Sequence, residues 1–281
     1  MKPTAKKALA LTLALSLGLG LAACGKDDPS STPDSTTGNA ITLKVGASPS
    51  PHGDILKVVQ PILAEEGIDL QIVEFTDYVQ PNLATEDGSL DANFFQHTPY
   101  LDQFNQENET HLISVGGVHF EPMGIYPGKT AAVKDLANGA LVGIPNDATN
   151  EARALLLLQE QGLITLPEDA DLNVTPKDIL DNPKNLKFQE MEAVQLPLAL
   201  EDLDIAVING NYAVTNGIQD TVLVTEGKEG LGAQTYQNIL VVKEGNENNE
   251  AIQKLYAALT SDAVKDYIQS TYTDQSVIPA F

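Results

Sequence analysis

Short apolar segments with strand character alternate with segments of helical spacing from Ile41 to the end of this chain. Residues 41–45 (ITLKV) alternate apolar and polar side chains, and the run DILKVVQPILAEE at 54–66 has helical spacing and stops at Gly67. A second strand is expected at 69–75. Such alternation is typical of α/β units, in which a helix connects neighbouring strands. We therefore expect an α/β fold with mostly parallel sheets.

The same patterns predict the remaining elements. Further strands are expected at 90–95, 140–145, 186–191, 204–209 and 237–243, and further helices at 99–106, 150–161, 194–200, 250–259 and 262–270. Residues 111–126 also have strand character, which Gly116-Gly117 should interrupt. The roughly 240 residues after position 40 fit two lobes better than one. We expect lobe 1 to comprise 41–125 plus 236–281, and lobe 2 to comprise 126–235. A cleft between two such lobes, beyond the carboxyl ends of their strands, is where ligands bind.

The N-terminus predicts export and lipidation. Lys2, Lys6 and Lys7 precede a short apolar run that ends at Cys24, the only cysteine of the chain. Residues 1–23 have the order of a secretory signal peptide, and the sequence LAAC at 21–24 resembles the lipobox of bacterial lipoproteins. The alternative is a simple signal peptide with an incidental cysteine. We expect lipidation of Cys24 and a protein anchored on the extracytoplasmic face of the cell membrane.

Residues 24–40 lack bulky apolar side chains and are rich in Ser, Thr, Pro, Asp and Gly, so they predict a flexible tether rather than a folded unit. The formal net charge of the chain is −23 at pH 7. Such a charge argues against nucleic acid as a partner, because nucleic acid is bound by neutralising phosphates with Lys and Arg.

Arg153 is the single arginine among sixteen basic residues. It lies in the run PNDATNEAR at 145–153, where a strand should end and a helix begin. A guanidinium binds a carboxylate through two parallel hydrogen bonds, which lysine cannot do, while the first turn of a helix is an unfavourable place for a cation. Two interpretations stay open: a clamp for a ligand carboxylate, or an ion pair at the surface or between the lobes.

Aromatic residues concentrate in the run FFQHTPY at 94–100, in a chain with only seven Phe, eight Tyr and no Trp. Phe95, His97 and Tyr100 there, and Tyr78 after the preceding strand, are candidates to line a pocket for an apolar, polarizable ligand group such as a thioether. Ordinary core packing is the alternative for the Phe and Tyr rings. A structural role is the alternative for His97.

Two asparagines are candidates for an ammonium group. Asn209 follows the apolar strand at 204–209 and Asn238 begins the strand at 237–243. An Asn side-chain oxygen can accept a hydrogen bond from an ammonium. The alternative is turn chemistry, in which Asn and Gly are common. That alternative is stronger for Asn211, which follows Gly210.

The chain resembles the methionine-binding lipoproteins of ABC importers, the MetQ/NlpA family, from about residue 43 to the end. The matching runs, in the order of the family, are LKVGASPSPHGDIL, VEFTDYVQPN, LDANFFQHTPYLDQF, FEPMGIY, VGIPNDATNEARALLLL, NPKNLKF, AVINGNYA and YQNILVV. One departure is DAT at 147–149, where the family often has Asp-Pro-Thr. That departure affects a turn rather than a contact.

The resemblance implies a two-lobed fold like that of periplasmic binding proteins, which closes over one amino acid. By this resemblance Arg153 would hold the ligand carboxylate, and Asn209 and Asn238 would hold the amino group, with Asn238 close to the hinge. The aromatic candidates would line the side-chain pocket: Tyr78, Phe95, His97 and Tyr100.

The implied function is capture of methionine, as the L- and also the D-form, for uptake. A methionine-containing dipeptide or another small amino acid is the alternative ligand. ABC permease and ATPase subunits would be the partners, since the chain has no G-x-x-x-x-G-K-[ST] loop of its own. We expect a monomer that binds without catalysis, cofactor or metal.

The sequence gives weaker support to three other classes of protein. A metal-binding lipoprotein would use the four histidines (His52, His97, His111 and His119), but none lies in H-E-x-x-H and no thiolate besides Cys24 is available. A secreted hydrolase would need a catalytic set, and no G-x-S-x-G elbow occurs. An adhesin with a vestigial pocket would bind no amino acid at all.

Overall fold

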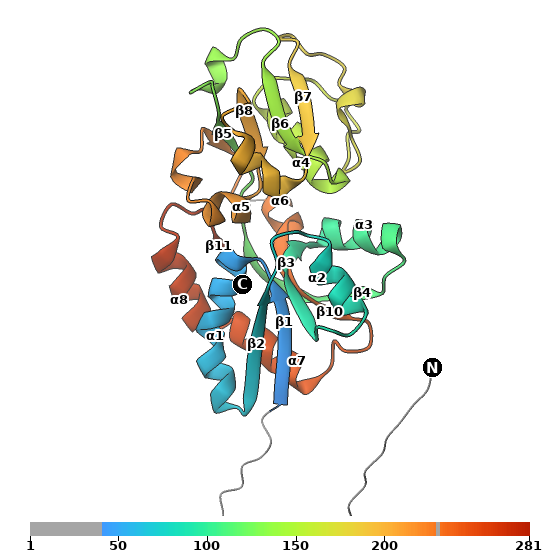
Figure 1. The fold of residues 1–281 in the computed structure, drawn as a ribbon, viewed down its shortest axis with the longest axis vertical. Helices are drawn as coiled ribbons and strands as arrows, with labels where there is room; N and C mark the ends of the chain where they lie inside the picture. The colour runs from blue at the N-terminus through green and yellow to red at the C-terminus, as the bar shows by residue number, and fades with distance from the viewer. Residues whose placement is uncertain (1–40, 229–230) are drawn as a thin grey trace, which may run out of the picture. The chain divides into compact units, whose positions relative to one another are not determined.

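A computed structural model describes residues 41–228 and 231–281. The predicted signal peptide, Cys24 and the tether lie outside the described residues. Two separate β-sheets organise the body, each with its own hydrophobic core (Figure 1). None of the described helices has the length and apolar character that a membrane span requires.

The first sheet has six strands in the order β11-β4-β10-β3-β1-β2. Their bounds are Ile41–Ala47 (β1), Ile68–Glu74 (β2), Ala92–His97 (β3), Leu112–Phe120 (β4), Gln237–Lys243 (β10) and Ile278–Pro279 (β11). The helices of this half are α1 (Asp54–Glu65), α2 (Gln80–Glu86), α3 (Thr98–Asn108), α7 (Glu250–Leu259) and α8 (Asp262–Thr271). Fully buried apolar side chains of α1, α7 and α8 share a core with β1. This burial supplies the main stabilisation of the first half.

The second sheet has five strands in the order β7-β6-β8-β5-β9. Their bounds are Gly124–Pro127 (β5), Leu141–Pro145 (β6), Lys187–Met191 (β7), Ile205–Ile208 (β8) and Val224–Thr225 (β9). The helices are α4 (Ala148–Glu160), α5 (Gly210–Thr215) and α6 (Leu231–Thr235). Short 3-10 helices occupy Val133–Asp135, Pro176–Asp178, Ala193–Ala199 and Gln219–Thr221, and a helical turn spans Pro49–Gly53.

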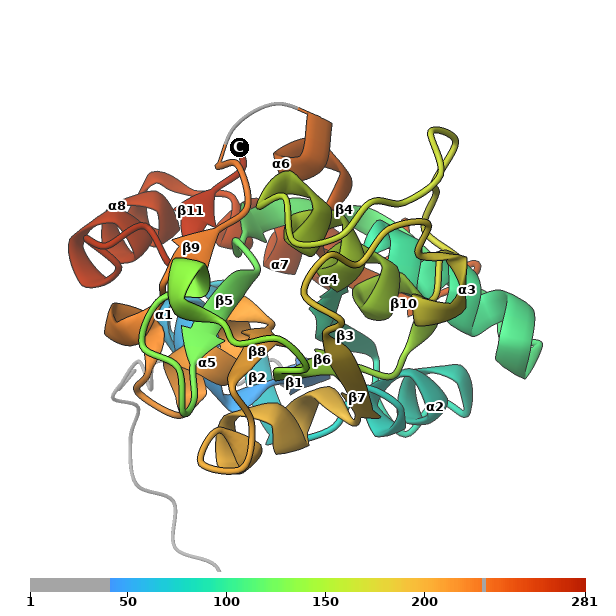
Figure 2. The same ribbon diagram turned by 90° about the horizontal axis from the view of Figure 1, so that it is seen from above.

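The chain crosses between the sheets twice, after β4 and after β9. Helix α3 of the first half contacts α4 of the second, as the view from above also shows (Figure 2). The segment 111–126 was expected to break at Gly116-Gly117, but β4 continues through both glycines and the break lies after Phe120. The two resulting strands lie in different sheets, because β5 pairs with β8 and β9. We therefore propose that the first lobe ends at 121–123, slightly before the predicted residue 125.

Two further expectations about secondary structure were wrong. The sheets are mixed rather than mostly parallel: β1 pairs in parallel with β2 and β3, but β10 is antiparallel to β3 and β4, because it returns from the second sheet. The helix expected at 194–200 is a 3-10 helix at Ala193–Ala199, and Pro197 within it lacks the N–H that an α-helix requires. The other predicted strands and helices are present, with small shifts at their ends.

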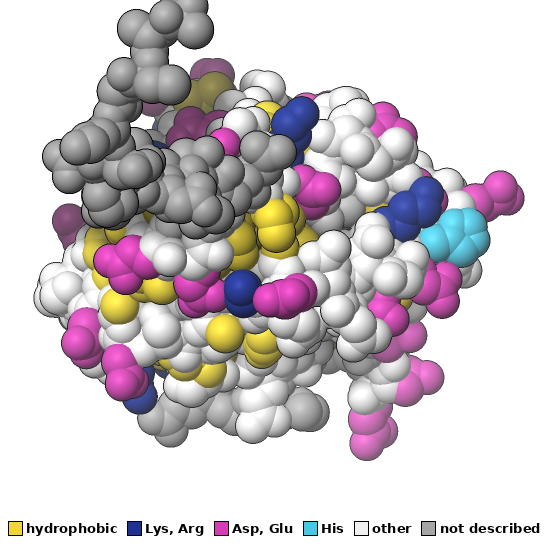
Figure 3. Space-filling model, turned by 90° about the horizontal axis from the view of Figure 1, so that it is seen from below, with side chains coloured by type: hydrophobic (Ala, Val, Ile, Leu, Met, Phe, Trp, Pro, Cys, Tyr) yellow, Lys and Arg dark blue, Asp and Glu magenta, His cyan; other side chains and the backbone are white. Residues whose placement is uncertain are grey.

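Acidic side chains are scattered over the surface. Seen from below, the molecule carries many Asp and Glu side chains and few Lys (Figure 3). This agrees with the formal net charge of −23. Like charges repel and favour solubility, but they do not specify the fold.

Candidate ligand-binding site

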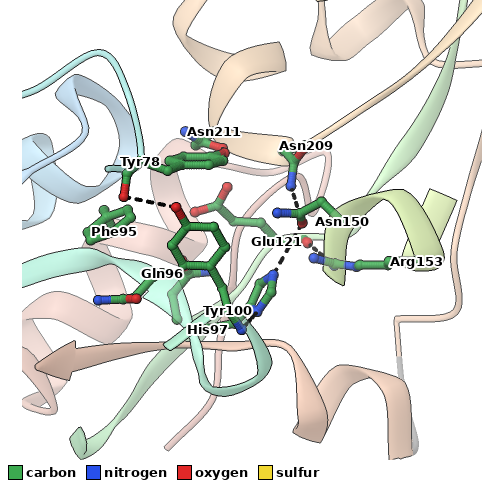
Figure 4. A pocket seen from close by; sticks show the side chains of 12 residues that line it. Tyr78, Phe95, Gln96, His97, Tyr100, Glu121, Asn150, Arg153, Asn209 and Asn211 are labelled. Atoms are coloured by element: carbon green, nitrogen blue, oxygen red, sulfur yellow. Dashed lines mark hydrogen bonds between the residues drawn. The ribbon is translucent and has the colours of Figure 1, made fainter. Parts of the chain in front are cut away.

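One pocket brings together all of the side chains that the sequence suggested for ligand binding (Figure 4). The predicted residues that line it are Tyr78, Phe95, His97, Tyr100, Arg153, Asn209 and Asn238. Residues from both halves contribute, because β3 and β8 end at this place and α4 begins beside it. The position matches the general rule that ligands bind beyond the carboxyl ends of strands.

Arg153 is buried and lies in the second turn of α4, not in the first turn as expected. The helix begins earlier because the Asp147 carboxylate caps it, accepting a hydrogen bond from the backbone N–H of Asn150 at 3.1 Å. The unfavourable interaction with the helix dipole is therefore weaker than the sequence suggested, since that effect is confined to the first turn.

The guanidinium of Arg153 is paired with Glu226, which directly follows β9. Its Nε lies 3.1 Å from both carboxylate oxygens of Glu226, and Nη2 donates to the same carboxylate. Nη2 also donates to the backbone carbonyl of Glu121 at 2.9 Å, and the Tyr236 ring lies 4.1 Å from the guanidinium carbon. Nη1 has no hydrogen-bond partner among the described residues. Arg153 thus forms an ion pair, but the pair is largely buried and lies within the second half, not at the surface or between the lobes as expected.

The aromatic residues form a cluster at one end of the pocket. Phe95, Tyr100 and Phe104 are buried together, and the ring of Tyr78 packs against those of Phe95 and Tyr100 with centroids 5.7 Å away in both cases. The centroid of the Tyr212 ring lies 5.0 Å from that of Tyr78. Both open interpretations therefore hold for these rings: they pack in a core and they also line the pocket.

Asn150 connects the two halves across the pocket. Its Oδ1 accepts hydrogen bonds from His97 Nε2 at 3.3 Å and from Asn209 Nδ2 at 2.8 Å. His97 Nδ1 in turn accepts from the backbone N–H of Tyr100 at 3.3 Å, so one neutral tautomer of His97 satisfies both contacts. Burial and then the Arg153 charge lower the pKa of His97 to about 3. His97 is therefore a neutral, structurally fixed side chain of the wall.

Two pocket amides have buried atoms that find no hydrogen-bond partner among the described residues: Asn209 Oδ1 and Asn211 Nδ2. A buried polar atom without a partner is costly, and it marks a place where a ligand or a water can bind. One of these atoms is an acceptor and the other a donor. Asn211, for which a turn role had seemed stronger, thus belongs to the pocket.

His52, His119, Glu121 and Asn238 form a buried cluster beside the pocket, and Glu121 and Asn238 line it. His119 Nε2 donates to Glu121 Oε1 at 2.7 Å, and His52 Nε2 donates to Asn238 Oδ1 at 2.8 Å. Burial lowers the pKa of His52 to about 4 and that of His119 to about 3, so both rings are neutral. The oxygen of Asn238, expected to accept from a ligand, is therefore already bonded to His52.

The donor atoms of His52, His119 and Glu121 lie within 4.8 Å of one another and could in principle hold a metal ion. The hydrogen bonds just described already use both Nε2 atoms. The geometry fits a hydrogen-bonded carboxylate better than a metal ligand set.

The pocket has four lining residues that the sequence did not suggest, Gln96, Glu121, Asn150 and Gly210, besides Asn211, for which a turn role was favoured. Gly210 marks a close approach, because a Cβ there would lie 2.7 Å from the Cβ of Glu121. The glycine in the run AVINGNYA was the available signal that a neighbour packs at this point. Nothing in the sequence indicates that the neighbour is Glu121, which is far away along the chain.

The model of the NlpA lipoprotein family matches residues 43–281. The chain belongs to the NlpA lipoprotein family. This confirms the resemblance inferred from the sequence runs. Among NlpA-type relatives, the methionine-binding lipoprotein MetQ of Bacillus subtilis is 36% identical over 266 residues, which cover 92% of this chain and 93% of the relative.

Solved structures confirm the two-lobed α/β fold of this NlpA-family chain. A nutrient-binding protein from Burkholderia cenocepacia, solved bound to methionine, has a TM-score of 0.80 and 39% identity, and the match covers 85% of this chain and all of that one. A periplasmic substrate-binding protein of an ABC transporter from Coxiella burnetii has a TM-score of 0.79 and 38% identity, covering 85% and 100% of the two chains.

Proposed function

We propose that this chain is the substrate-binding lipoprotein of an ABC importer and that it captures methionine outside the cytoplasmic membrane. The observation that carries the proposal is a single buried pocket that combines a guanidinium, unpartnered amide atoms and a cluster of aromatic rings. These three features correspond to the carboxylate, the ammonium and the apolar side chain of a free amino acid. The names of the relatives in Bacillus subtilis and Burkholderia cenocepacia support methionine as that amino acid.

In this proposal the ligand carboxylate accepts hydrogen bonds from Nη1 of Arg153 and from Nδ2 of Asn211. The ammonium donates to Oδ1 of Asn209. The thioether lies among the rings of Tyr78, Phe95 and Tyr100, where sulfur–aromatic contacts are favourable by about 0.3–1.5 kcal/mol each. Enclosure of the ligand excludes water and strengthens the charged contacts.

Calorimetry and native mass spectrometry test this function. Native mass spectrometry of the purified protein should reveal a bound molecule with the mass of methionine. After the ligand is removed by unfolding and refolding, titration with L-methionine, D-methionine, a methionyl dipeptide, leucine and glutamate should give the tightest binding for methionine. Binding of none of these compounds would contradict the proposal and would favour an interaction protein without a ligand.

We also propose that lipidated Cys24 anchors the protein on the extracytoplasmic face and that ABC permease and ATPase subunits receive the ligand. The name of the ABC-transporter relative in Coxiella burnetii supports this partnership. Labelling of cells with radioactive palmitate should mark the wild type but not Cys24→Ala. Protein that stays in the membrane fraction without the cysteine would contradict the anchor.

A further inference from the structure

Glu121 is a buried carboxylate at the crossing from β4 to β5, and only 5% of the residue is exposed. Its Oε1 accepts from Nε2 of His119 at 2.7 Å and lies 3.4 Å from Nε2 of His52. The side chain lines the pocket and extends toward its interior between Tyr100 and Asn211 (Figure 4).

No full positive charge touches this carboxylate among the described residues. His52 and His119 are neutral, since burial lowers their pKa values to about 4 and about 3, and of the two His119 donates the hydrogen bond to Glu121. Arg153 contacts Glu121 only through the backbone carbonyl, and its guanidinium is paired with Glu226. A buried carboxylate without a cation is costly, and a bound cation would relieve that cost.

We propose that the Glu121 carboxylate receives the α-ammonium group of the ligand, so that the site requires a free, protonated amine beside the ligand carboxylate. This inference rests on the proposed function. The unpartnered Oδ1 of Asn209 lines the same pocket and accepts a second N–H of the ammonium. His119 is a positioning residue, because its Nε2–H holds one carboxylate oxygen, whereas the Nε2–H of His52 is donated to Asn238.

The proposal predicts the class of ligand that is rejected. The α-hydroxy acid analogue of methionine keeps the carboxylate and the thioether but replaces the amine with a hydroxyl. N-acetylmethionine keeps the nitrogen but loses its charge. Neither compound offers Glu121 a counter-charge, so we expect the pocket to bind both weakly. If Glu121 played no part in binding, both compounds would bind about as well as methionine.

Calorimetry with methionine and its α-hydroxy analogue tests this role in the wild type, in Glu121→Gln and in Glu151→Gln. Glu151 is a matched control, because it is also buried, its pKa is also raised by burial to about 7, and it lies outside the pocket lining. We expect the wild type to prefer methionine by at least about tenfold. In Glu121→Gln the affinity for methionine should fall by about tenfold or more, and the affinity for the analogue should fall by less than about twofold. Glu151→Gln should change neither affinity.

The pH dependence of wild-type binding tests the same contact without a substitution. Burial raises the pKa of Glu121 to about 7. The ionisable groups that face it are His52, His119, Arg153, Tyr78, Tyr126 and Tyr272. The two histidine pKa values lie below this range, and burial raises those of the three tyrosines above it. Glu121 is therefore the group of this set that becomes protonated between pH 8 and pH 5.5, while methionine stays zwitterionic.

The preference for methionine over the α-hydroxy analogue should fall by at least about fivefold between pH 8 and pH 5.5, because protonation of Glu121 removes the counter-charge. A ratio of the two affinities that does not change with pH would overturn the proposal. So would a Glu121→Gln variant in which the affinities for both ligands fall by the same factor. Equal binding of both ligands by the wild type would overturn it while leaving the proposed function intact. Binding of neither ligand would contradict both.

Discussion

The hydroxyl of Tyr78 donates a 2.6 Å hydrogen bond to Oδ1 of Asn211 and thereby connects the two halves of the protein at the pocket. Tyr78 follows β2 of the first sheet, and Asn211 lies in α5, which follows β8 of the second. A second bond, from the hydroxyl of Tyr212 to the backbone carbonyl of Thr76 at 2.9 Å, joins the halves beside it. Tyr78 thus lines the pocket and also forms part of the contact between the two halves.

Replacement of Tyr78 by Phe should weaken methionine binding by about three- to tenfold, because one hydrogen bond that joins the two halves at the pocket is lost, at about 0.5–1.5 kcal/mol. Tyr256→Phe is the control, since the Tyr256 hydroxyl bonds to the carbonyl of Gly117 away from the pocket. Calorimetry should show an altered affinity only for the first variant. If Tyr78→Phe bound methionine as tightly as Tyr256→Phe and the wild type, the hydrogen bond to Asn211 would not contribute to binding.

Glu226→Gln should lower the stability of the ligand-free protein by about 2 kcal/mol or more, because the buried guanidinium of Arg153 loses its counter-charge. Glu86→Gln is the control. Its partner Lys243 lies 3.0 Å away with 44% of its side chain exposed, so about 1 kcal/mol or less should be lost. Denaturant unfolding measures both changes. Added methionine should stabilise Glu226→Gln more than the wild type, since the ligand carboxylate replaces the missing charge.

The three buried histidines should stay neutral from pH 8 to pH 5.5, because burial lowers the pKa values of His52, His97 and His119 to about 4, 3 and 3. Histidines of the unfolded chain gain protons near pH 6.5. Below that pH the unfolded state therefore binds more protons at these positions than the folded state does. Each of the three histidines then lowers the free energy of unfolding as the pH falls toward the pKa of that histidine in the folded protein. An NMR titration of the imidazole signals checks this. A midpoint above pH 6 for any of the three would contradict the burial argument.

Local patterns predicted the fold well, and the reason is physical. Strands and helices such as 41–45 and 54–66 are read from spacing and from stops at glycine, which are properties of neighbouring residues. The return of the chain to the first lobe was expected, but the antiparallel direction of β10 was not predictable in this way. It depends on the chain crossing to the second sheet and back, a relationship between residues that are distant in sequence.

The same distinction explains the site. Arg153, Asn209 and the aromatic run were visible because each stands at a strand end, where ligands bind in α/β folds. Glu121 and Glu226 were not visible, because their roles depend on where the two crossings meet Arg153 and the histidines. In a chain with 39 acidic residues, no local pattern distinguishes these two.

The most direct test of the ligand site is the affinity of Arg153→Ala for L-methionine, measured by calorimetry beside the wild type and Arg153→Lys. Circular dichroism establishes that the variants are folded. Lysine keeps the charge but not the planar donor geometry, so its affinity should fall between the other two. We predict that Arg153→Ala binds at least about tenfold more weakly, a loss of about 1.4 kcal/mol or more. Unchanged affinity in a folded Arg153→Ala protein would contradict the assignment of Arg153 to the ligand carboxylate.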